Sequence, residues 1–133
     1  MGVKEAGIRH DKDKLDWSLV PMHLLERMVL VLMFGAQKYG KHNWRKGLHY
    51  SRITNSLQRH LNAFIRGEDV DPASGLPRSA HILCNALFLA GMEEEHPEMD
   101  DRISSAPKHR TKEQATLPHG DRLVQSSLFH KEE

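Results

Sequence analysis

The 133-residue sequence has very little cysteine and no long apolar run. Its single cysteine, Cys84, excludes an internal disulfide and a cysteine-based zinc site, and it suits a reducing compartment. No apolar run is long enough to span a bilayer, and residues 1–7 lack the apolar core of a secretory signal peptide. We therefore expect a cytoplasmic protein that has no membrane partner.

Strand signals are also missing, because no stretch of useful length alternates apolar and polar residues. The apolar residues recur instead at helical spacing, which predicts three helices, over residues 22–39, 51–66 and 77–95. Pro21 favours the first helix start, Gly40 is a plausible first stop, and Ser51 is a good N-cap for the second helix. The expected class is all-α, a compact bundle of three to four helices.

The predicted helices carry wide apolar stripes. The stripe of the first helix comprises Leu24, Leu25, Met28, Val29, Leu32 and Met33. The inward residues expected for the second helix are Ile53, Leu57, Leu61, Phe64 and Ile65. Since three helices of this kind rarely close a core alone, we expect a homo-oligomer, either a dimer or a tetramer.

Composition changes near the end of the third predicted helix. Residues 1–96 read as one helical domain that opens with an irregular charged arm over residues 1–20. Residues 97–133 are polar and lack periodicity, with Pro107, Pro118 and Gly120 interrupting them. We predict that residues 97–133 form a tail that is disordered or packed on a neighbouring subunit.

Acidic residues are absent between Glu26 and Glu68, an interval that contains eight lysines and arginines. From Glu68 to Asp101, by contrast, nine carboxylates accompany a single cation, Arg78. These charges could be solvated helix faces that pair across the bundle. Alternatively, they could line a cleft in which cations bind an anionic ligand and carboxylates hold a metal ion.

Two polar residues interrupt the apolar stretch over residues 80–92. His81 and Asn85 are four residues apart, so they share one helix face. Neighbouring backbone could satisfy both side chains, but His60 and the acidic turn over residues 68–75 precede them in the sequence. Histidine can orient or deprotonate water, and Mg²⁺ prefers oxygen ligands. We therefore predict catalytic roles for His60, His81 and Glu68, and a Mg²⁺ site (Mn²⁺ possible) at Glu68, Asp71 and Asn85.

Several segments, in the same order, resemble the phage and bacterial family of dATP/dGTP diphosphohydrolases, which is itself similar to the all-α MazG-type nucleotide pyrophosphohydrolases. They are the arm Arg9–Lys14 and the segments Gly35–Tyr39, Asn43–Gly47, Arg59–Leu61, Gly67–Asp71, Ser74–Pro77 and Ala80–His81 with Cys84–Leu89. The resemblance covers roughly residues 8–92. Arg78 departs from the family pattern, since a histidine is usual at that position. The wider MazG-type pattern has an ExxE pair on one helix and an ExxD pair on the next, and neither pair occurs at the corresponding place in this core.

The resemblance implies hydrolysis of a purine deoxynucleoside triphosphate between its α and β phosphates, by a metal-activated water. Cations can neutralise phosphate oxygens and an aromatic ring can stack on a base. The residues expected to bind substrate are Lys14, Lys38, Tyr39, Asn43, Trp44, Arg45 and Arg59.

The sequence is also compatible with two other functions. A nucleic-acid-binding module would use the basic segment over residues 27–67. We do not expect a nucleic acid partner, because the cations are spread over two helices and a loop without a groove-reading motif. A non-catalytic helical bundle that binds a protein partner is the second alternative.

Overall fold

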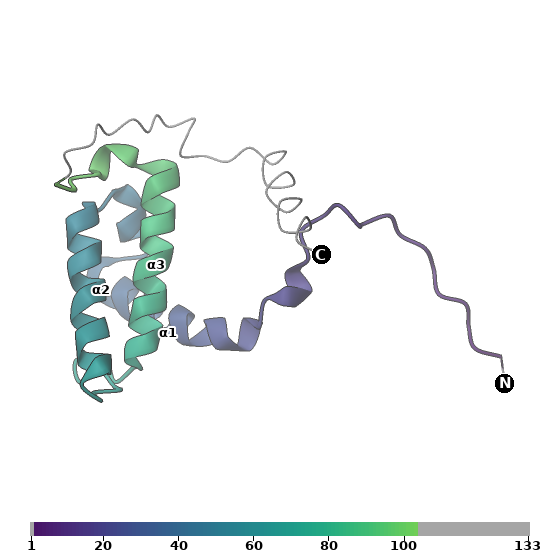
Figure 1. The fold of residues 1–133 in the computed structure, drawn as a ribbon, viewed down its shortest axis with the longest axis horizontal. Helices are drawn as coiled ribbons and strands as arrows, with labels where there is room; N and C mark the ends of the chain where they lie inside the picture. The colour runs from purple at the N-terminus through teal and green to yellow at the C-terminus, as the bar shows by residue number, and fades with distance from the viewer. Residues whose placement is uncertain (1, 104–133) are drawn as a thin grey trace, which may run out of the picture. The chain divides into compact units, whose positions relative to one another are not determined.

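The computed structural model describes residues 2–103, which contain three α-helices, labelled in Figure 1. They are α1 (Met22–Tyr39), α2 (Tyr50–Ile65) and α3 (Arg78–Glu95), with short 3-10 turns η1 (Trp17–Leu19), η2 (Asn43–Lys46) and η3 (Pro97–Met99). The only β feature within residues 2–103 is an isolated bridge between Val70 and Pro77. The all-α prediction is confirmed.

Residues 2–20 and residues 21–103 fall in separate compact units, so each is described by itself. The N-terminal segment has no regular structure until η1, where the Asp16 carboxylate accepts a hydrogen bond of 3.0 Å from the Ser18 N–H. Lys14 lies in this segment, where its N–H bonds the Asp11 carbonyl at 3.0 Å. Its predicted role in phosphate binding stays a prediction.

Helix α1 has the predicted bounds, beginning after Pro21 and ending before Gly40, whose φ of 90° favours glycine. Val31 is buried against Ala80 and Cys84 of α3. Helix α1 leaves five aliphatic residues exposed, and they are Leu24 and, on the face away from Val31, Met22, Val29, Leu30 and Met33.

Helices α2 and α3 run antiparallel and form the main contact of the fold (Figure 1). Tyr50 and Ile53 pack against Met92 at one end of the pair. The residues of α2 that face α3 therefore follow the series Ile53, Ser56, His60 and Ala63. The apolar stripe of α2 lies to one side of this series. For that reason Phe64 and Ile65, predicted to face inward, are 49% and 72% exposed.

The predicted N-cap of the second helix is wrong. Helix α2 begins at Tyr50, and His49 is its N-cap without a side-chain cap bond. Ser51 lies in the first turn, where its N–H donates to the Asp101 carboxylate at 2.9 Å. A carboxylate fifty residues away thus satisfies a donor that the helix start leaves free.

Residues 97–102 continue the packed structure. Met99 packs on the cluster formed by Tyr50, Ile53 and Met92, and Asp101 bonds Ser51. Packing therefore extends past residue 96, where the tail was predicted to begin. Residues 104–133 of the predicted tail lie outside the described residues. Over the described part, no helix has the length and apolar character needed to cross a membrane.

Candidate functional site

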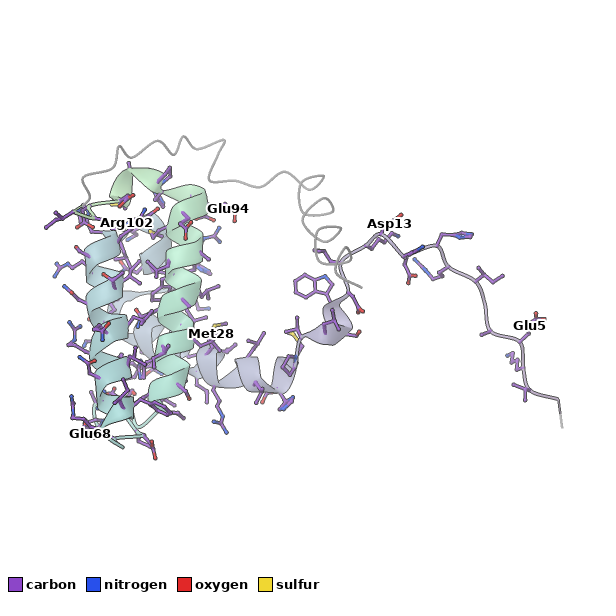
Figure 2. All side chains as sticks on the ribbon, viewed as in Figure 1. Glu5, Asp13, Met28, Glu68, Glu94 and Arg102 are labelled. Atoms are coloured by element: carbon purple, nitrogen blue, oxygen red, sulfur yellow. The ribbon has the colours of Figure 1, made fainter. Side chains whose placement is uncertain are left out.

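The connection between α2 and α3 is a tight turn that presents Asp71 beside the start of α3. Gly67, with φ of 85°, ends α2. The Asp71 N–H bonds the Leu76 carbonyl at 2.9 Å, and the Gly75 N–H bonds the Asp71 carbonyl at 2.8 Å. These two bonds, with the bond of 2.8 Å from the Arg78 N–H to the Asp69 carbonyl, hold the turn in place. Figure 2 shows Glu68 at this end of the α2–α3 pair.

Asp71 is held by Ser74. Oδ2 of Asp71 accepts the Ser74 N–H at 3.1 Å and the Ser74 hydroxyl at 2.8 Å. The same hydroxyl oxygen lies 2.7 Å from His81 Nε2, which is 3.5 Å from Asp71 Oδ2. Burial alone would raise the pKa of Asp71, but the Ser74 hydrogen bonds and nearby His81 and Arg78 outweigh it and lower the pKa.

Arg78 joins the acidic turn to α2. Its Nη1 lies 3.2 Å from Asp71 Oδ1 and 3.1 Å from His60 Nδ1. A guanidinium group only donates, so His60 Nδ1 is the acceptor and the proton of a neutral His60 sits on Nε2. The Arg78 side chain is 13% exposed, and its buried Nε has no hydrogen-bond partner. We call His60, Asp71, Ser74, Arg78 and His81 the histidine–aspartate cluster.

The two histidines of this cluster are stacked, and both have lowered pKa values. Loss of hydration on burial is the main cause for each. For His60, His81 lowers the pKa further, whereas Asp71 raises it. Both rings are therefore neutral at pH 7. They act in the cluster as hydrogen-bonding groups and not as cations.

Asn85 is buried but does not face the carboxylates. Its Nδ2 donates to the Ser56 hydroxyl at 3.2 Å and to the His81 carbonyl at 3.0 Å. Neighbouring groups thus satisfy the amide, which is the simpler of the two interpretations of this residue. The structure brings Asn85 close to His81 and not to Glu68 or Asp71.

The predicted magnesium ligands do not converge. Glu68 is 53% exposed and pairs with Arg66 at 3.1 Å, while Arg78 Nη2 lies 4.0 Å from it. Both oxygens of Asp71 are already bonded, to Arg78 and Ser74. Within residues 2–103, no group of three or more His, Cys, Asp or Glu side chains is arranged to hold a metal ion. The residues as placed therefore do not fit a protein-held Mg²⁺.

The loop over residues 40–49, which carries the predicted substrate residues Asn43, Trp44 and Arg45, lies at the other end of α3. Arg45 Nη2 pairs with Glu95 Oε1 at 2.6 Å, and Glu95 is fourteen residues, or about 20 Å of helix, from His81. Trp44 packs on Phe88, with ring centroids 4.8 Å apart. Figure 2 places Glu94 and Arg102 at this end, opposite Glu68. The structure does not bring Trp44 or Arg45 to the histidine–aspartate cluster.

The remaining predicted substrate residues are placed as follows. Arg59 is exposed on α2 beside His60, close enough to lower its pKa. Lys38 lies at the end of α1 with its Nζ 5.3 Å from the ring centroid of Tyr39, and Tyr39 is exposed. Asn43 opens η2, next to Trp44. Of the predicted substrate residues described in this unit, Arg59 is the one beside the cluster.

Sequence reasoning assigned no role to Ser74 or Arg78. Arg78 could have been found from its charge, because it is the single cation between Glu68 and Asp101. Ser74 had no distinguishing signal beyond its place in the turn, since its partners are set by tertiary geometry.

Two comparisons with known proteins give a match. Residues 4–102 match the family described as "dATP/dGTP diphosphohydrolase, N-terminal". A protein of Salmonella phage PMBT28 named "dATP/dGTP diphosphohydrolase" is 33% identical over 109 residues, which is 82% of this chain and 37% of the phage protein. The chain thus spans little more than a third of this relative's length. No solved structure matches the chain.

Proposed function

The chain belongs to the dATP/dGTP diphosphohydrolase family, and from this premise we propose that it hydrolyses dGTP, dATP or both to the monophosphate and pyrophosphate. The observation that carries the proposal is that the family match spans all three helices and the turn that bears Asp71. The histidine–aspartate cluster supports it, because buried polar groups of this kind are costly unless they serve structure or chemistry.

The reaction requires a water molecule to attack the α-phosphorus and lose a proton, while pyrophosphate leaves. Glu68 is the exposed carboxylate at the edge of the cluster, so we assign it the role of proton acceptor. His60 carries its proton on Nε2 and is assigned as a hydrogen-bond donor to a phosphate oxygen. Arg59, exposed next to it, would add positive charge. His81 would hold Ser74 and Asp71 in place.

Magnesium enters the proposal with the nucleotide. Mg²⁺ is commonly held by substrate phosphates and water, with only one or two carboxylates. Bound in this way it would neutralise phosphate charge, and Mn²⁺ could replace it. No step is assigned to a metal held by Asp71 and Asn85, because these side chains are bonded elsewhere.

The direct test is to incubate the full chain with each deoxynucleoside triphosphate and Mg²⁺ or Mn²⁺, and to measure monophosphate and pyrophosphate. We expect release with dGTP or dATP. Absence of release with every nucleotide under both metals would refute the enzyme and leave a partner-binding bundle. Binding of a DNA duplex that weakens steeply with salt, without hydrolysis, would favour a nucleic-acid module.

Variants test whether residues of the cluster and its edge take part in hydrolysis, by comparison with a nearby exposed residue. We expect His60→Gln to lower kcat by about 10²-fold or more, as for loss of a group that acts on the reacting phosphate. Glu68→Gln should act similarly. Asp69→Asn is the matched control for Glu68→Gln, because Asp69 is a neighbouring exposed acid in the same turn. Full activity in Glu68→Gln would contradict its role as proton acceptor.

We propose a homo-oligomer as the active form, either a dimer or a tetramer. The support is the exposed face of α1, where Met22, Val29, Leu30 and Met33 recur at spacings of three, four and seven residues. The test is the mass in solution, by light scattering, of Leu30→Glu. Gln37→Glu is the control, since it adds the same charge at an exposed polar position of α1. A wild-type monomer would refute this part of the proposal.

A further inference from the structure

Arg78 is the cation of the histidine–aspartate cluster. Its Nη1 donates to Asp71 Oδ1 at 3.2 Å and to His60 Nδ1 at 3.1 Å, and Nη2 lies 4.0 Å from Glu68 Oε2. Arg78 and Asp71 are 13% and 15% exposed, so little water screens their pairing. The guanidinium therefore bonds one histidine of α2 and one carboxylate of the turn, and a second carboxylate of the turn lies nearby.

A divalent cation at this position would act on the same carboxylate and histidine. A bound metal compensates carboxylate charge, gathers ligands from separate elements and leaves a ligating histidine with its proton on the other nitrogen. Arg78 compensates Asp71, gathers the same side chains, and leaves the proton of His60 on Nε2. A metal ion would have to compete with Arg78 for Asp71 Oδ1 and with Ser74 for Asp71 Oδ2.

We propose that Arg78 takes the place of a divalent cation in the histidine–aspartate cluster, so that Asp71 is a positioning residue and not a metal ligand in this chain. Removing the guanidinium would free Asp71 Oδ1 and His60 Nδ1, the two atoms that it bonds, and these side chains would shift to bind a cation together with Glu68. The inference concerns the site of the proposed function, but it predicts metal binding and not hydrolysis. The failure of one can therefore be distinguished from the failure of the other.

The test titrates the full chain with Mn²⁺ alone, without nucleotide, and follows free Mn²⁺ by electron paramagnetic resonance. We expect wild type and Asp71→Asn to bind Mn²⁺ equally weakly. Arg78→Gln should bind Mn²⁺ at least about 10-fold more tightly, because the freed carboxylate of Asp71 adds a ligand. The double variant Arg78→Gln/Asp71→Asn should lose this gain.

Arg66→Gln is the matched control, because Arg66 pairs with Glu68 at 3.1 Å on the surface and its loss changes the net charge equally. An equal gain in Arg66→Gln would mean that general electrostatics, and not Arg78 itself, limits binding. The proposal is overturned by that result, by a folded Arg78→Gln without a gain, or by wild-type binding that falls 10-fold in Asp71→Asn.

Arg78→Gln leaves a buried carboxylate without its cation, so its fold is checked first by circular dichroism. Should it unfold, the comparison of wild type with Asp71→Asn still decides the point. A second measurement needs no change at Arg78. Nitrogen-15 spectra of the imidazoles, with His60 identified by its loss in His60→Gln, should show the proton on Nε2. A proton on Nδ1 would contradict the contact with Arg78.

Discussion

The imidazole rings of His60 and His81 lie almost parallel, with their centroids 4.3 Å apart and their planes 7° apart. One ring comes from α2 and the other from α3, at the end of the helix pair where the acidic turn begins. Two imidazolium ions would repel each other at this distance. The stack therefore holds only while at most one ring is charged, and this makes the pair sensitive to acid.

The stacked histidines should make the protein less stable as the pH falls. Burial lowers both pKa values below 6.5, so the unfolded chain binds these protons more readily than the folded one. The contribution to stability is complete above pH 6.5 and is lost as the pH falls through the lowered pKa values. Urea unfolding between pH 5 and 7.5 measures it. His81→Gln should flatten this dependence, whereas exposed His23→Gln should leave it unchanged.

His96 should show the opposite pH dependence. Its Nδ1 faces the Glu98 carboxylate at 2.8 Å and its Nε2 faces the Arg45 carbonyl at 2.7 Å. Both partners accept, so both bonds form only when His96 is protonated, and the Glu98 bond followed by the Arg45 bond raises its pKa. The stabilisation is complete below pH 6.5 and is lost as the pH rises through the raised pKa.

Unfolding free energies of wild type and His96→Gln at pH 6 and pH 9 test this expectation. The difference between the two proteins should be larger at pH 6. His42→Gln serves as a control, because His42 is an exposed histidine near the same loop. A difference that is constant with pH would show that only one of the two bonds forms.

Ser74→Ala should destabilise the protein by about 1–3 kcal/mol, because the hydroxyl bonds a partly buried carboxylate and also accepts the Leu76 N–H at 3.2 Å. Ser79→Ala is the matched control, since Ser79 is exposed at the start of α3, and its change should stay within about 0.5 kcal/mol. Urea unfolding of both variants gives the comparison. Equal stability would show that Ser74 does not hold Asp71.

Gly91→Ala tests whether Trp44 is a packing residue. A Cβ at position 91 would lie 2.6 Å from Trp44 Cζ3, so the indole must move, and we expect a loss of about 1–3 kcal/mol. Gly35→Ala is the control, because nothing lies within 4 Å of its added Cβ on α1. That change should be neutral or stabilising by up to about 1 kcal/mol. Thermal melts of the two variants suffice.

Cys84 should be unreactive in the folded protein. It is 2% exposed between α1 and α3, and burial raises the pKa of its thiol to about 11. The thiolate is the reactive form, so a disulfide reagent at pH 8 should label it only after unfolding. Comparing labelling rates with and without denaturant measures this. Fast labelling of the native protein would contradict its burial.

The helices could be predicted from the sequence because their signals are local. The bounds of α1 were predicted correctly, since Pro21 and Gly40 act through their own backbone geometry. The start of α2 was predicted one residue late, because Ser51 is bonded by Asp101, a partner that lies fifty positions away. Local patterns contain no information about such a partner.

The sequence by itself determined the all-α class, the end of α1 and the start of α3 after the acidic turn, and it placed His81 on a buried face. Only the tertiary structure decided which groups meet. The antiparallel pairing of α2 with α3 brings Arg78 to His60 across eighteen positions and takes Arg45 to Glu95 across fifty. Helical periodicity repeats within a few residues, whereas these contacts depend on how two helices align. Thus Arg78, which the sequence marked only as an isolated cation, lies at the centre of the cluster.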